Sequence, residues 1–179
     1  MQKKGFTLLE MIISMGVFAV AALIGVGSLL ALTSAQRKAL VFQSTQDNIR
    51  FAVEAMARDI RTGNFYYCGT SSSDIPASPS YKDCASGGPS LNFTNVSGQR
   101  ITYQAIGSRI QKSQDGGPFQ AITSSDIGIE YLTFYVIGAP VDDDFHPRVT
   151  IVARGIAGSG ASRSELSLQT TVSERTVQR

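Results

Sequence analysis

The sequence predicts an α+β protein in which one long N-terminal helix, half membrane anchor and half amphipathic, packs on a C-terminal antiparallel β-sheet. Three observations lead to this prediction. Residues 11–32 are almost entirely apolar or small, and helical periodicity continues beyond them as far as residue 60. The rest of the chain consists of short segments with strand character, separated by turns rich in glycine and proline. A chain of 179 residues has room for one ordinary domain besides the anchor.

The apolar segment is long enough to cross a bilayer. Residues 11–36 contain no charged side chain. As a helix, residues 11–32 would measure about 33 Å, against roughly 30 Å for a bilayer core. The basic residues Lys3 and Lys4 precede this segment. We therefore expect the N-terminus to stay in the cytoplasm and the body to lie on the other side of the membrane.

Two features of this segment have alternative explanations. A secretory signal peptide, cut near residues 33–35, is the alternative to a retained helix, although its apolar region would exceed the usual length of about 7–15 residues. Glu10 stands at the edge of the apolar run. The helix dipole alone favours a carboxylate in a first turn, whereas a carboxylate that becomes buried needs a partner and marks a functional residue.

The run Lys4–Glu10 (KGFTLLE), followed by the apolar segment, resembles the leader junction of type IV prepilins and type II secretion pseudopilins. This resemblance implies that a prepilin peptidase cuts between Gly5 and Phe6 and methylates the new amine of Phe6. It also implies that Glu10 neutralises the terminal amine of a neighbouring subunit during filament assembly. That role is chemically sensible because a buried ammonium needs a counter-charge.

The same resemblance implies a division of the chain and a location. A leader peptide would occupy residues 1–5, a transmembrane and filament-core helix residues 6–36, the amphipathic half of the helix residues 37–63, and the β-sheet body residues 64–179. The protein would cross the inner membrane once, with a periplasmic or extracellular body, and then join a filament. Its partners would be other pilin or pseudopilin subunits, the prepilin peptidase, an inner-membrane assembly platform and membrane lipid.

Apolar residues at helical spacing predict that the helix continues into the body with one buried face. We expect it to run from Phe6 to Thr62 and to stop at Gly63. On another face, Arg50 and Glu54 are four residues apart and can pair. The predicted apolar face consists of Phe42, Ile49, Val53, Met56 and Ile60.

The body is expected to form strands that pack on this helix. Residues 58–61 and 109–112 also resemble the J or W type of minor pilins and pseudopilins, a looser likeness than that of the leader. The predicted strands are Ser90–Thr94, Arg100–Ile106, Ser108–Lys112, Phe119–Ile122, Ile127–Ile137, Arg148–Ile156 and Glu165–Thr176.

Few side chains of the body suggest chemistry. Cys68 and Cys84, the only two cysteines, should form a disulfide if the body is exported, and a metal or redox pair is the alternative. His146 is the only histidine and follows the acidic run Asp142–Asp144. That run could bind calcium, but it lacks the spacing of a calcium loop, so a solvated turn is the prediction. We expect no catalytic residue, no metal site and no cofactor.

The predicted function is structural: a minor pilin or pseudopilin subunit of a type IV pilus or a type II secretion pseudopilus. A DNA-uptake pseudopilin, an adhesive subunit and a membrane-tethered hydrolase that uses His146 are the alternatives. Without Lys3 and Lys4 the chain has 14 basic and 14 acidic residues, so its body lacks the excess of positive charge that drives nucleic-acid binding. Nucleic acid is therefore not an expected partner.

Overall fold

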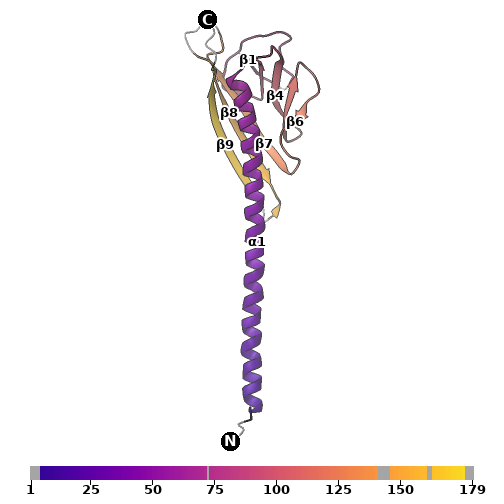
Figure 1. Cartoon of the computed structure of the whole chain (residues 1–179), viewed down its shortest axis with the longest axis vertical. Coiled ribbons are helices and arrows are strands. Elements are labelled where there is room, and N and C mark those ends of the chain that lie inside the picture. Colours follow the sequence, from indigo (N-terminus) through magenta and orange to yellow (C-terminus); the bar gives the residue numbers. More distant parts are fainter. Residues whose placement is uncertain (1–4, 72, 141–145, 161–162, 176–179) are drawn as a thin grey trace. The chain divides into compact units, whose positions relative to one another are not determined.

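The computed structural model describes residues 5–71, 73–140, 146–160 and 163–175, which divide into two compact units, residues 1–40 and 41–179. Helix α1 (Leu8–Arg61) forms the first unit and continues as the first element of the second (Figure 1). The strands of the second unit are β1 (Asn64–Gly69), β2 (Cys84–Gly88), β3 (Ser90–Thr94), β4 (Arg100–Ile106), β5 (Arg109–Gln114), β6 (Gln120–Ala121), β7 (Ile127–Ile137), β8 (Arg148–Ala157) and β9 (Ser164–Ser173).

The strands form two antiparallel sheets, where the sequence predicted one. A five-stranded sheet has the order β1-β3-β4-β5-β6, and a four-stranded sheet has the order β2-β7-β8-β9. The α+β class and the antiparallel pairing are confirmed. The single sheet was wrong because β1 and β2, although consecutive in the chain, pair with different partners: β1 with β3, and β2 with β7. Figure 1 shows both sheets beside the part of α1 that belongs to this unit.

The core of the second unit lies between α1 and the two sheets. Ile49, Val53, Met56 and Ile60 are buried as predicted, at 0–3% exposure. Phe42 lies on the same side of the helix as residue 49, about 20° away at about 100° per position, but it is 43% exposed and does not join the buried part of this face. It stands at the very start of the second unit, which begins at Val41, and Val41 packs against the core.

Glycine allows α1 to approach the four-stranded sheet closely. Gly155 of β8 faces Ile49 of α1, and a Cβ atom at position 155 would collide with the side chain of Ile49. The core on this side therefore depends on the absence of a side chain at one position of β8.

The strand bounds were predicted well where side chains alternate. β3, β4 and β7 have their predicted bounds, and β8 and β9 differ from theirs by a few residues at most. Thr176, the predicted end of the last strand, lies outside the described residues. Strands β1 and β2 were missed. β2 (CASGG) contains none of the branched or aromatic residues that favour strands, whereas β1 (NFYYCG) contains three aromatic residues and its omission has no such reason. β5 begins one residue late because Ser108 adopts a left-handed turn conformation, with φ 61°.

Candidate functional site

The start of α1 is set by Thr7. Its hydroxyl accepts a hydrogen bond from the backbone N–H of Glu10 at 3.2 Å, and its carbonyl accepts one from Met11 N–H at 3.2 Å. A threonine followed three residues later by glutamate is the pattern of a helix capping box. The helix therefore begins at Leu8 rather than at the predicted Phe6. Gly5 and Phe6 precede it, so the peptide bond between them lies in non-helical chain.

Glu10 lies in the first turn of α1, where the helix dipole favours its charge. Its side chain is exposed, and its carboxylate takes part in no hydrogen bond or ion pair with the residues that the structure describes. It also leaves unmade the second half of the capping box, in which a glutamate would accept a hydrogen bond from Thr7 N–H. The carboxylate is consequently left without a partner within the described part of the chain.

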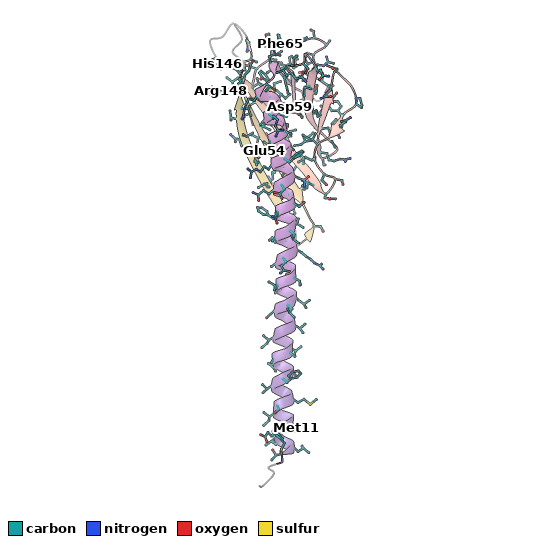
Figure 2. The ribbon with its side chains drawn as sticks, in the orientation of Figure 1. Met11, Glu54, Asp59, Phe65, His146 and Arg148 are labelled. Atoms are coloured by element: carbon teal, nitrogen blue, oxygen red, sulfur yellow. A yellow bond between two sulfur atoms is a disulfide. The ribbon has the colours of Figure 1, made fainter. Side chains whose placement is uncertain are left out.

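The first unit presents an apolar surface on every side. Residues 5–40 are all exposed, and side chains radiate from α1 around Met11 in Figure 2. This is the one helix within the described residues that is long and apolar enough to span a membrane, with a mean hydropathy of 2.3 over its most apolar window. The hydroxyl groups on this stretch do not oppose such a location because each donates to a backbone carbonyl of the preceding turn. They belong to Ser14, Ser28, Thr33 and Ser34.

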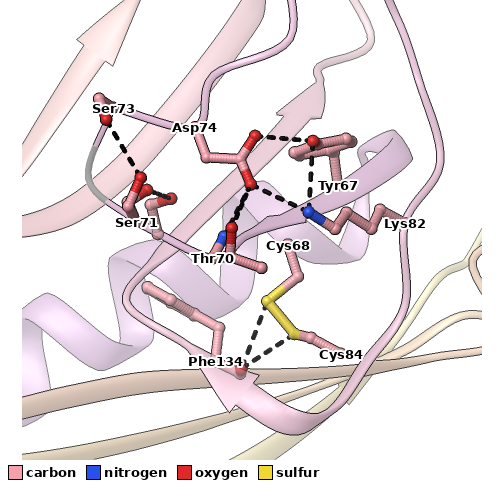
Figure 3. A network of polar contacts seen from close by, with 10 residues as sticks. Tyr67, Cys68, Thr70, Ser71, Ser73, Asp74, Lys82, Cys84 and Phe134 are labelled. Carbon is pink, nitrogen blue, oxygen red and sulfur yellow. Dashed lines mark hydrogen bonds and ion pairs between the residues drawn. A yellow bond between two sulfur atoms is a disulfide. The ribbon is translucent and has the colours of Figure 1, made fainter.

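In the second unit, Cys68 and Cys84 form the predicted disulfide, with their Cα atoms 5.8 Å apart. Cys68 belongs to β1 and Cys84 to β2, so the bond links the five-stranded sheet to the four-stranded sheet. The carbonyl oxygen of Phe134, on β7, lies 3.6 Å from the first sulfur and 3.2 Å from the second. A disulfide carries no S–H group, and these are therefore close contacts rather than hydrogen bonds (Figure 3).

The loop closed by this disulfide is organised around Asp74 (Figure 3). Oδ2 of Asp74 accepts hydrogen bonds from the N–H of Thr70 at 2.8 Å and from its hydroxyl at 2.9 Å, and it pairs with Lys82 Nζ at 2.9 Å. Oδ1 accepts from the hydroxyl of Tyr67 at 2.7 Å. These contacts, the Thr70 N–H first among them, hold the pKa of Asp74 well below its usual range. The contact with Asp74 in turn raises the pKa of Lys82.

A second carboxylate, Asp59, ties α1 to the five-stranded sheet. Its Oδ2 accepts a hydrogen bond from Tyr103 of β4 at 2.6 Å and pairs with Lys112 of β5 at 2.6 Å. Burial and the contact with Asp59 both raise the pKa of Tyr103. Neither Asp59 nor Asp74 was predicted from the sequence. The partners of Asp59 lie 44 and 53 positions away, and although those of Asp74 lie within eight positions, no local pattern indicates the pairing. The predicted Arg50–Glu54 pair is present at 2.8 Å, on the exposed side of α1.

The body offers no catalytic arrangement around its histidine within the described residues. His146 is exposed (Figure 2), and the acidic run Asp142–Asp144, considered above for calcium, lies outside the described residues. No group of three or more potential metal ligands occurs among the residues described.

Residues 1–32 match a family model described as the prokaryotic N-terminal methylation motif. The chain thus carries a prepilin-type cleavage and methylation motif, which implies a pilin-like protein that a prepilin peptidase processes. Proteins of this kind are typically structural subunits rather than enzymes. Together with the apolar helix, the motif indicates a membrane-anchored, exported protein. No curated protein and no solved structure matches the chain.

Proposed function

We propose that this chain is a minor pilin or pseudopilin, cut between Gly5 and Phe6, methylated on Phe6, and assembled into a type IV pilus or a type II secretion pseudopilus. Its apolar helix lies in the inner membrane before assembly and in the filament core afterwards. Its partners are other pilin-like subunits and the inner-membrane assembly platform. The assignment to the J or W type belongs to this proposal and rests on the likeness of residues 58–61, 68–69, 109–112 and 168–175.

The state of Glu10 is the observation that supports this proposal most directly. A single carboxylate stands at the head of an exposed apolar helix, and it has no partner among the described residues. Burying such a helix against copies or relatives of itself would place that charge in an apolar environment, which is costly unless a cation meets it. The amine of a mature Phe6 in a neighbouring subunit is such a cation.

Processing is tested by mass spectrometry of the N-terminal peptide isolated from cells that make the protein. The mature peptide should begin at Phe6 and carry one added methyl group. Gly5→Val should leave the leader attached, since the peptidase would meet a branched side chain beside the bond it cuts. Gly16→Val makes the same change where a Cβ atom meets nothing within 4 Å, and it should be processed normally. An intact leader in the unmodified protein, or a cut near residues 33–35, would contradict the proposal.

Assembly is tested with Glu10→Gln, which keeps the shape of the side chain and removes its charge. Leaving a buried ammonium without its partner costs about 3–5 kcal/mol, so incorporation into filaments should fall roughly 100-fold or more. The ratio of subunit in sheared filaments to subunit in membranes measures this effect. Glu54→Gln is the matched control because Glu54 forms an exposed ion pair in the body. Normal incorporation of Glu10→Gln would disprove the pairing role.

A further inference from the structure

A pocket of about 230 Å³ lies in the second unit, between the five-stranded sheet and the segment 76–80 of the disulfide loop. Its lining comes from strands β1, β3 and β4, from Gly98 in the turn between β3 and β4, from Asp115 just after β5, and from the loop. The side chains used below are Phe65, Asn92, Arg100 and Asp115, all of which line the pocket. None of them takes part in the assembly role proposed above.

Two hydrogen-bond donors beside this pocket have no partner in the described part of the chain. Asn92 is 1% exposed; its Oδ1 accepts from the hydroxyl of Thr102 at 2.7 Å, while its Nδ2 is buried without a partner. Nη1 of Arg100 donates to the carbonyls of Pro76 at 2.8 Å and Ala77 at 3.1 Å, while its Nε is likewise buried without a partner. Buried donors are rarely left unpaired, so this pair indicates an acceptor that the described residues do not supply.

The pocket also offers an acceptor, and its formal charges balance. Oδ1 of Asp115 accepts a hydrogen bond from the N–H of Arg100 at 2.8 Å, whereas no described residue donates to Oδ2. The guanidinium of Arg100 and the carboxylate of Asp115 together carry no net charge. For an anionic ligand, the repulsion by Asp115 would therefore offset most of the attraction by Arg100. The lining favours a neutral ligand that both donates and accepts hydrogen bonds.

Phe65 supplies an aromatic wall and a strained backbone. Its φ of 57° is rare for a bulky residue. Its ring packs on that of Tyr81, with centroids 5.0 Å apart. Strained residues of this kind concentrate at ligand-binding positions, where the surrounding structure holds them in place. An aromatic ring beside polar groups suits a ligand with one apolar face and polar edges.

We propose that this pocket binds a neutral polyhydroxylated ring of the size of one monosaccharide unit. Hydroxyl groups accept from Asn92 and Arg100 and donate to Asp115, while the C–H face of the ring packs on Phe65. The volume of about 230 Å³ is below the roughly 300–1,000 Å³ of pockets for drug-sized ligands, which limits the occupant to about one ring. The filament subunit would then carry a saccharide site on its body, independent of its assembly role.

The test uses the full chain in a detergent without a sugar headgroup, because a glycosidic detergent would compete for the pocket. The neutral probes are the methyl glycosides of glucose, galactose, mannose and N-acetylglucosamine, and acetate and phosphate are the anionic probes. Saturation-transfer NMR detects binding and titration measures it. At least one neutral glycoside should bind with a Kd on the order of 1 mM, and the anions should not compete with it.

Asp115→Asn is the decisive variant because asparagine tolerates the left-handed backbone at this position, where φ is 51°. It keeps an acceptor for Arg100 N–H and replaces the free carboxylate oxygen with a donor, so affinity for the glycoside should fall about tenfold or more. Phe65→Asn, which removes the ring from a second left-handed position, should weaken binding as well. Asp126→Asn is the matched control, since Asp126 lies outside the pocket and should leave affinity unchanged.

Circular dichroism establishes that the three variants are folded before binding is compared. Unchanged affinity in Asp115→Asn would overturn the proposal, as would binding of the anions alone. Failure of every neutral glycoside to bind at concentrations of about 100 mM would do the same, because a site for this class should be measurably occupied there.

Discussion

The two halves of helix α1 differ in what their surfaces contact. Residues 8–40 are exposed on every side, whereas the half that begins at Val41 buries one face, including Ile49 and Met56, in the core of the body. Both halves belong to one helix, so the difference comes from side chains and not from the backbone. The second half completes a fold within the chain, while the first half has exposed apolar surface and a carboxylate without a partner among the described residues.

Truncating an isoleucine to alanine should lower the free energy of unfolding of the body in the second half of α1 and leave it unchanged in the first half. Ile49→Ala empties a fully buried position and should lower the free energy of unfolding of the body by about 4 kcal/mol. Ile24→Ala changes a side chain that is 66% exposed and should leave that free energy unchanged. Denaturation of the full chain in detergent, followed by the near-UV signal of its tyrosines, measures both. Equal losses would mean that the two halves do not differ in the way described.

The disulfide lies in the body, so its loss should lower the stability of the body and leave the helix of residues 8–40 unaffected. Replacing Cys68 and Cys84 together by alanine should lower the stability of the body by about 3 kcal/mol, the amount expected for a loop of this length. Reduction of the unmodified protein should have a similar effect. Helical content, which also depends on residues 8–40, should change little at temperatures where the body is still folded. No change in the unfolding midpoint on reduction would contradict the prediction.

Within the body, the partly buried ion pair between α1 and the five-stranded sheet can be compared with an exposed ion pair on the same helix. Asp59→Asn breaks the ion pair with Lys112 and weakens the hydrogen bond from Tyr103, and we expect a loss of about 1–2 kcal/mol. Glu54→Gln breaks the exposed pair with Arg50 on the same helix and should cost less than Asp59→Asn. The two variants are compared by thermal unfolding. A larger loss in Glu54→Gln would show that burial does not decide the strength of these pairs.

A dependence of body stability on pH is a smaller effect than the loss expected for Asp59→Asn. The pKa of Asp74 is lowered by folding, so its stabilising contribution is present at neutral pH and is lost as the pH falls below about 4, the ordinary value for aspartate. Asp74→Asn should lower stability by about 1 kcal/mol at neutral pH, since the site is partly exposed. The two proteins should converge as the pH is lowered from 4 to 2 in a series of thermal melts. A constant difference over this range would exclude Asp74 as the titrating group.

The parts of the structure that local sequence determines were predicted, and the parts that depend on distant pairing were not. The helical spacing of Ile49, Val53 and Ile60 predicted the buried face of α1, and the alternation in residues 127–137 predicted β7 with its bounds. The assignment of β1 and β2 to different sheets has no local signal. Asp59 contacts Tyr103 and Lys112, which are 44 and 53 positions away, and no local sequence pattern predicts these contacts either.

The candidate sites follow the same rule. Gly5, Phe6 and Glu10 could be proposed from the sequence because their motif is contiguous and is followed at once by the apolar segment. The pocket beside Asn92 and Arg100 could not, because its groups come from β1, two further strands, the turn at Asp115 and the disulfide loop. Its most informative feature, a buried donor without a partner, exists only once the chain has folded.

The link between Cys68 and Cys84 also has a mechanical consequence. A force applied to the body through α1 reaches both sheets, because both pack on that helix. Hydrogen-bonded strands separate under loads that a covalent bond withstands. The two sheets therefore cannot be peeled apart at β1 and β2 while the disulfide is intact, and a subunit pulled by its anchor would bear tension as one piece.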